Sequence, residues 1–82
     1  MNQQLIFNND FAYNGARQAV SFSCLVAGLK VNCFIAVPAG ATAAEFLSSV
    51  KAAAFSWEDS AEQAIADDAY NEAGEIWFEL PG

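Results

Sequence analysis

Acidic side chains are the most abundant groups in this chain that could do chemistry. Eight of them follow one another along its second half: Glu58, Asp59, Glu62, Asp67, Asp68, Glu72, Glu75 and Glu79. Such a density suggests a cation site, but the run that begins at Asp67 lacks the central glycine and closing glutamate of an EF-hand loop. We therefore interpret the run as a solvent-facing acidic surface, with a partner-docking surface as the alternative, and predict no metal-binding residues.

Nucleophilic chemistry lacks the partners that it needs. The chain contains no histidine, so neither a Ser-His-Asp arrangement nor a histidine-activated thiolate can form. Its two cysteines, Cys24 and Cys33, are too few for a disulfide framework, and too few for a zinc site without histidine. Neither glycine-rich phosphate-binding motif occurs. We predict no catalytic residues and no cofactor, with a small ligand-binding or enzymatic pocket near Cys33 as an alternative.

Two alternating apolar runs within residues 17–37 organise the rest of the chain as a β-hairpin that turns at Ala27-Gly28. The facing pairs are then all apolar: Val26 with Leu29, Cys24 with Val31, Phe22 with Cys33 and Val20 with Ile35. A slip of one residue would place Lys30 and Asn32 on this face, so the pattern selects the register. The two cysteines become buried diagonal neighbours, which is a poor geometry for a disulfide.

The residues before the hairpin predict a short strand followed by a loop. Leu5-Ile6-Phe7 is the strand, and Asn8-Asn9-Asp10 and Asn14-Gly15 are typical of turns. Phe11 and Tyr13 lie between the two turns, and we expect both rings to be buried and to fix the loop to the core.

The residues after the hairpin predict two helices, at about 43–54 and 57–68, with one kinked helix as the alternative. Thr42 and Glu45 match a capping box, and apolar residues recur at helical spacing behind them. Ser56, followed by two acids, resembles a second N-cap. Asp67 and Asp68 are unfavourable at a helix C-terminus, so we expect this end to fray unless a backbone N–H or a partner meets it.

A last strand follows Ala73-Gly74, where apolar and polar residues alternate with a period of two. Ile76, Phe78 and Leu80 should face inward, and Glu75, Trp77 and Glu79 outward. Trp77 would then lie on the sheet face away from the helices, near Phe34 and Leu25. These three residues are a candidate interface, unless the N-terminal segment covers them.

The elements combine into one α+β domain over residues 1–82. We expect a small antiparallel or mixed sheet, in the order βββ-αα-β, with two helices packed on one face. The net charge is −7, and residues 45–82 carry nine acids against Lys51 alone. Such a surface repels phosphate groups, so we expect neither nucleic-acid nor anionic-membrane binding. No signal peptide or membrane span is evident, which favours a cytoplasmic protein.

The first half of the chain contains several short motifs: Leu5-Ile6-Phe7, Tyr13-Asn14, Arg17, Val20-Ser21-Phe22, Leu25-Val26-Ala27-Gly28 and Cys33-Phe34-Ile35. They resemble those of the DUF1488 family, the small Shew3726-like bacterial proteins. The family opens with I-x-F, continues with an aromatic residue before Asp or Asn, and then has a basic position and V-x-F. Its central run is L-V-x-G followed by C-x-I.

The helical half resembles the same family, with T-x-x-x-[FW]-L and A-E-x-x-I matched by Thr42, Phe46-Leu47, Ala61-Glu62 and Ile65. Ala27 departs from the Asn or Asp that the family tends to have at this turn, so a tight type I′ turn is less favoured here. The resemblance implies an α+β fold and a cytoplasmic bacterial protein. It implies no reaction, cofactor or catalytic residue.

Three functions are compatible with these observations. The first is a non-catalytic protein–protein interaction module or a homodimer, with an unknown protein or a second copy as its partner. The second is a ligand-binding protein or minor enzyme with a pocket near Cys33. The third is an acidic mimic of nucleic acid that binds a basic protein surface.

Overall fold

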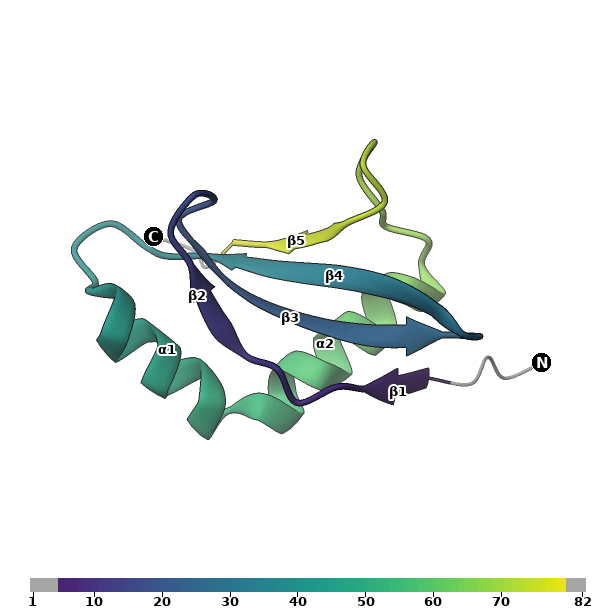
Figure 1. Ribbon diagram of the computed structural model, residues 1–82, viewed down its shortest axis with the longest axis horizontal. Helices are drawn as coiled ribbons and strands as arrows, with labels where there is room; N and C mark the ends of the chain where they lie inside the picture. The colour runs from purple at the N-terminus through teal and green to yellow at the C-terminus, as the bar shows by residue number, and fades with distance from the viewer. Residues whose placement is uncertain (1–4, 80–82) are drawn as a thin grey trace.

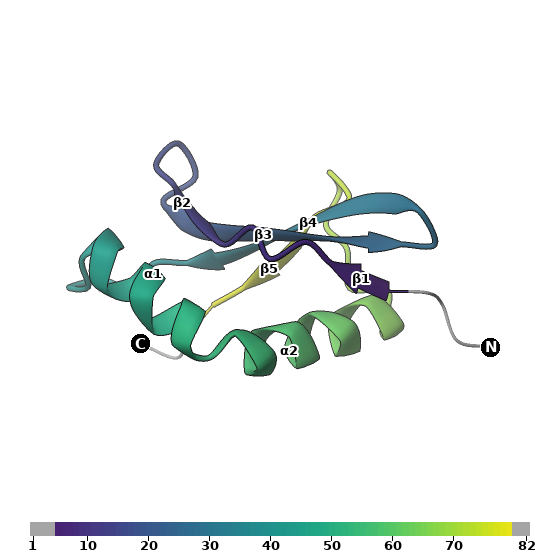
Figure 2. The same cartoon turned by 60° about the horizontal axis from the view of Figure 1, so that its bottom comes forward.

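The computed structural model describes residues 5–79, which form one mixed β-sheet with two helices on one of its faces (Figures 1 and 2). The predicted α+β class and the placement of the helices are confirmed. The predicted inward position of Leu80 lies outside the described residues. In chain order the elements are β1 (Leu5–Phe7), β2 (Ala12–Asn14), β3 (Ala19–Val26), β4 (Leu29–Ala36), α1 (Ala43–Ala52), α2 (Ala54–Ala66) and β5 (Ile76–Phe78).

The central hairpin, β3 and β4, has the predicted register along its whole length, from Val26 opposite Leu29 to Ala19 opposite Ala36. Ala27 and Gly28 both have positive φ, at 50° and 86°. A type I′ turn requires this conformation, so the tight turn forms although Ala27 replaces the preferred Asn. The apolar pairing across the strands therefore outweighs the poor turn residue.

The hairpin carries its apolar face beyond the helices at its tip (Figure 2). Val20, Phe22 and Cys24 are buried against the helices, but Leu29 is 73% exposed. The alternation thus predicts correctly which way each side chain points. It does not predict whether another element is there to cover the side chain.

Residues 8–16 are not only a loop, as the turn residues had suggested, because β2 pairs antiparallel with β3 beside β1. The edge strand is interrupted between β1 and β2, where the Asp10 carboxylate stands in for a backbone carbonyl. Its Oδ1 accepts the backbone N–H of Ser23 at 2.8 Å, and its Oδ2 accepts the Ser23 hydroxyl at 2.5 Å. The Asp10 side chain therefore accepts the hydrogen bond that β3 cannot make to a neighbouring strand at this gap.

The two aromatic residues of this segment differ in burial. Phe11 stacks on Phe22 with ring centroids 4.7 Å apart and packs against the core, as predicted. The prediction that Tyr13 is buried is wrong, because its side chain is 41% exposed. Tyr13 belongs to β2, an edge strand, so its ring has a neighbouring strand on one side only.

The helices connect β4 to β5, which pairs parallel to β4 with Cys33 opposite Ile76 and Phe34 opposite Trp77. A parallel pair requires such a crossover. Ile76 is buried and Phe78 packs edge-on against Trp57 with centroids 5.6 Å apart, so both face inward as predicted. Among the described residues, no helix combines the length and the hydrophobicity needed to cross a bilayer.

Two helices form, as predicted, and Ala53 separates them. The Thr42 hydroxyl accepts the backbone N–H of Glu45 at 3.2 Å, which is the expected cap of α1. The prediction that Ser56 caps α2 is wrong: α2 begins at Ala54, and Ser56 lies inside its first turn. The N–H of Ala53 still bonds to the carbonyls of Ser49 and Val50 in α1. The chain therefore leaves helical geometry only at Ala53, and α2 begins at the next residue.

The acidic end of α2 closes in a Schellman motif. Asp68 adopts positive φ, at 56°, its N–H bonds to the Ile65 carbonyl, and the N–H of Ala69 bonds to the Ala64 carbonyl. Backbone N–H groups thus meet this helix end, one of the outcomes that the sequence left open. The conformation is one that glycine adopts at little cost and aspartate does not.

Cys24 and Cys33 are both fully buried free thiols in the core between sheet and helices. They are diagonal neighbours, because Cys24 faces Val31 and Cys33 faces Phe22. The hydrogen bond that Cys33 donates to Cys24 and the burial of this thiol both raise the pKa of Cys33, which keeps its sulfur protonated. The two thiols act here as small apolar core side chains.

Candidate functional site

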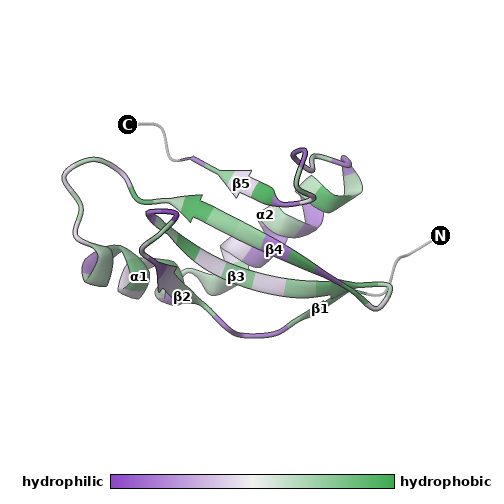
Figure 3. Cartoon of the chain, turned by 45° about the horizontal axis from the view of Figure 1, so that its top comes forward, coloured by the Kyte–Doolittle hydropathy of each residue, from purple (hydrophilic) through white to green (hydrophobic). Residues whose placement is uncertain are grey.

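The open face of the sheet, opposite the helices, carries a compact cluster of aromatic and charged side chains. Figure 3 views this face, where polar and apolar segments alternate along β3 and β4. Trp77 of β5 stacks on Phe34 of β4, with ring centroids 4.7 Å apart and planes inclined by 19°. The parallel pairing of β5 with β4 places the two rings side by side.

Arg17 reaches over this aromatic pair from the turn between β2 and β3. The Cζ atom of its guanidinium lies 4.7 Å from the centre of the Phe34 ring and 5.0 Å from that of Trp77. Both distances are typical of cation–π contacts. Arg17 therefore covers the rings, a role that the sequence analysis did not assign to it, and Phe34 is only 6% exposed.

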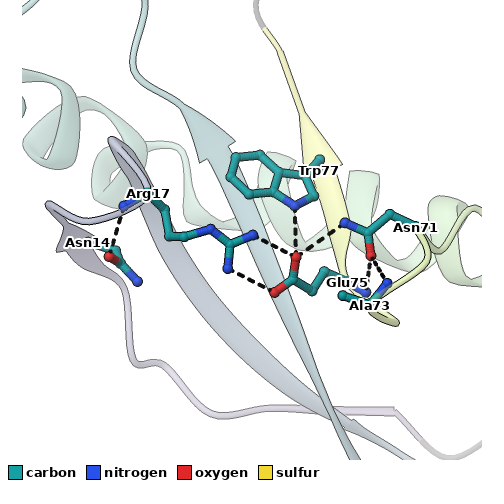
Figure 4. A network of polar contacts seen from close by, with 6 residues as sticks. All are labelled: Asn14, Arg17, Asn71, Ala73, Glu75 and Trp77. Carbon is teal, nitrogen blue, oxygen red and sulfur yellow. Dashed lines mark hydrogen bonds and ion pairs between the residues drawn. The ribbon is translucent and has the colours of Figure 1, made fainter.

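The same guanidinium holds Glu75 in a two-bond fork (Figure 4). Arg17 Nη2 donates to Glu75 Oε1 at 2.8 Å, and Nη1 donates to Oε2 at 3.1 Å. The indole Nε1 of Trp77 also donates to Oε1, at 3.0 Å. The carboxylate thus joins the guanidinium and the indole, and its own side chain is only 14% exposed. We call Arg17, Phe34, Glu75 and Trp77 the Arg–Trp cluster.

Two asparagine side chains accept hydrogen bonds from the backbone segments that carry Arg17 and Glu75 (Figure 4). Asn14 Oδ1 accepts the backbone N–H of Arg17 at 3.2 Å, which fixes the turn that carries the arginine. Asn71 Oδ1 accepts the N–H groups of Ala73 and Glu75, at 3.0 and 2.9 Å. Asn71 Nδ2 also donates to Glu75 Oε1 at 3.2 Å. The loop before β5 is therefore wound around one asparagine, which points Glu75 toward Arg17.

The electrostatics of the cluster keep both charges in place at neutral pH. Hydrogen bonds from Arg17, Trp77 and Asn71 lower the pKa of Glu75 to about 2. Glu75 in turn raises the pKa of Arg17 above its ordinary value. A carboxylate with so low a pKa is a poor proton acceptor near neutral pH. The arrangement suits contact with another molecule better than acid–base chemistry.

The structure brings two of the three predicted interface residues together. Trp77 and Phe34 are in contact, whereas Leu25 lies four positions along β3 from Ser21, the partner of Phe34. At about 3.3 Å per residue this is roughly 13 Å away. Leu25 is flanked there by Ile6, which is 47% exposed, and by Lys30.

Four residues of the site were missed: Arg17, Glu75, Asn14 and Asn71. Arg17 was visible only as the basic position of the family motif, and Glu75 only as one acid of the acidic run. The acidic run itself does not form a metal centre within residues 5–79: no group of three or more His, Cys, Asp or Glu side chains is close enough to hold an ion.

The sequence of this chain matches a family model over residues 5–78, which is described as "Protein of unknown function (DUF1488)". The chain belongs to the DUF1488 family. A protein of unknown function from this family, from Shewanella loihica PV-4, has a similar crystal structure with a TM-score of 0.81. It is 24% identical in sequence, and the match covers 94% of this chain and 93% of that one. This DUF1488 chain matches no curated protein.

Proposed function

We propose that this DUF1488 protein is a non-catalytic module that binds another protein chain through the open face of its sheet. The observation that carries the proposal is the Arg–Trp cluster, in which the Arg17 guanidinium lies over two stacked rings. Tryptophan and arginine are the residue types most enriched at the energetic centres of protein interfaces. They stand here on the face of the sheet opposite α1 and α2 (Figure 3).

The rigidity of the cluster supports this proposal. Arginine and glutamate side chains ordinarily lose much rotamer freedom when a partner immobilises them. Here the fork between Arg17 and Glu75, and the bond from Trp77, already hold them in one arrangement. A partner would meet a preformed surface and would pay less entropy for binding.

The acid–base properties of the open face also support binding over catalysis. Glu75 is held ionised by its three donors. The hydroxyl of Ser23 donates to Asp10, and Ser23 is only 2% exposed. This serine is therefore inaccessible to a substrate. Asp10, the acid beside it, accepts a hydrogen bond from the backbone N–H of Ser23 in β3.

Photo-crosslinking in cells of the source organism tests the proposal. We would place p-benzoylphenylalanine at Asn32, an exposed position of β4 whose side chain shares the open face with Phe34. Phe55 is the matched control, because this aromatic residue is 84% exposed on the helical side of the molecule. We expect protein adducts from position 32 and few from position 55.

Arg17→Ala and Trp77→Ala, each combined with the probe at position 32, should reduce the adducts, provided that circular dichroism shows them to be folded. The proposal is wrong if position 32 captures no protein, or if position 55 captures as much as position 32.

A further inference from the structure

The distribution of charge points to a second copy of this chain as the molecule that covers the open face, so that two sheets pack face to face about a two-fold axis. This inference rests on the proposed function, which requires only that some protein binds there. It deepens that proposal by naming the partner.

The helical side of the molecule is strongly acidic. Six acids lie in α1, in α2 or directly after α2, against the single cation Lys51: Glu45, Glu58, Asp59, Glu62, Asp67 and Asp68. Two copies with a net charge of −7 each repel one another whenever these helical sides approach. Any stable self-contact must therefore keep the helices apart.

The open face is close to neutral, because its charges are largely matched on the face itself. Arg17 is paired with Glu75. Asp10, which accepts hydrogen bonds from Ser23, keeps its negative charge, and the positive charge of Lys30 equals it in size. Lys30 is exposed, on the same face as its partner Leu25, and forms no ion pair with any residue from 5 to 79. Face-to-face contact between two open faces thus places both acidic helical sides outward, in solvent.

Lys30 and Glu79 are two exposed charges near opposite ends of β4, and continuing the alternation of β5 past Trp77 assigns Glu79 to the open face. Lys30 lies beside the hairpin turn, whereas Glu79 follows Phe78, the partner of Ile35 near the other end of β4. A two-fold axis that runs across the strands, in the plane between the sheets, turns the second copy end for end. Lys30 of each copy then approaches Glu79 of the other, which gives two complementary contacts for each dimer.

The apolar content and the size of the face fit a weak dimer. Ile6 is 47% exposed, and Leu25, Ala36 and Trp77 are partly exposed. With eight-residue central strands, at about 3.3 Å per residue and with four strands about 4.8 Å apart, the face has a projected area on the order of 500 Å². Stable dimers bury about 800 Å² per partner. We therefore expect a dissociation constant in the micromolar range.

Sedimentation equilibrium of the full chain, over about 1 to 500 µM, tests the inference. We expect the mass to rise from 8.8 kDa toward twice that value. Lys30→Glu should weaken association about tenfold, because each dimer loses two ion pairs and gains two repulsions. Lys51→Glu makes the same change in net charge on the helical side and is the matched control, with little effect expected.

The double variant Lys30→Glu with Glu79→Lys should restore association, because it exchanges the two charges across the symmetric contact. A strict monomer at every concentration would overturn the inference, as would equal losses from Lys30→Glu and Lys51→Glu. The photo-crosslinker at position 32 separates the two proposals. If it captures a different protein while the chain sediments as a monomer, the binding face stands and the second copy is excluded.

Discussion

Arg17 and Glu75 are 58 residues apart in the sequence, yet their side chains meet in a two-bond fork with N–O distances of 2.8 and 3.1 Å. The fork ties the turn between β2 and β3 to the loop that precedes β5, across the width of the sheet. It also closes over Phe34 and Trp77. The same contact therefore shapes the open face and holds the β2–β3 turn against the loop that precedes β5.

The stability of the protein should depend on the ionisation of Glu75. The pKa of Glu75 is about 2 in the folded protein, below its ordinary value of 4.5. A carboxyl group with a lowered folded pKa stabilises the fold fully above its unfolded pKa, and loses this contribution as the pH falls through the folded pKa. Thermal melts of wild type and Glu75→Gln should therefore differ near neutral pH and converge between about pH 4.5 and pH 2. Glu72→Gln, in the same loop, is the control, and equal convergence for both variants would contradict the prediction.

Replacing Arg17 by lysine should uncover the aromatic pair although the charge is kept. Lysine cannot form the two-bond fork or lie flat on the rings. In a Trp57→Phe background Trp77 is the only indole, so its fluorescence reports on its own environment. We expect Arg17→Lys to shift the emission to longer wavelength and to lower the melting temperature. Lys51→Arg is the control, and an unchanged spectrum for Arg17→Lys would show that the fork does not cover Trp77.

Asp68→Gly should stabilise the protein by about 1 kcal/mol, because glycine adopts the positive φ of this position without the strain of a side chain. The change also removes a negative charge from the C-terminal end of α2, where it is unfavourable. For a chain of this size the melting temperature should rise by about 4–8 °C. Asp67→Gly is the matched control: it removes the same charge where φ is −86°, and it should give no such gain.

Asp10→Ala should destabilise the protein by about 1–3 kcal/mol, because the N–H and hydroxyl of the buried Ser23 would lose their acceptors. The measurement is the free energy of unfolding in urea. Asp59→Ala, at an exposed position of α2, removes an acid without such bonds and should change stability by less than about 0.5 kcal/mol. Similar losses in the two variants would mean that charge, and not the bridging of β3, explains the effect.

Features that depend on neighbouring residues could be predicted from the sequence. The register of β3 and β4 follows from the alternation on both sides of Ala27-Gly28, because a slip by one residue would bury Lys30. The cap at Thr42 and the inward side of β5 follow in the same way from spacing. In each case the partners are a few residues apart or are set by one short turn.

Features that depend on distant residues were decided only by the tertiary structure. Pairing with β3 makes β2 a strand, although its residues resemble a loop, and Asp10 bonds β3 in the gap beside it. The crossover through α1 and α2 sets β5 parallel to β4, and only this pairing brings Trp77 onto Phe34. The outward position of Trp77 was therefore evident from the sequence by itself, because alternation is local. The covering of Trp77 by Arg17 could not be predicted from the sequence, because Arg17 meets Trp77 and Glu75 only when both ends of the chain join the same sheet.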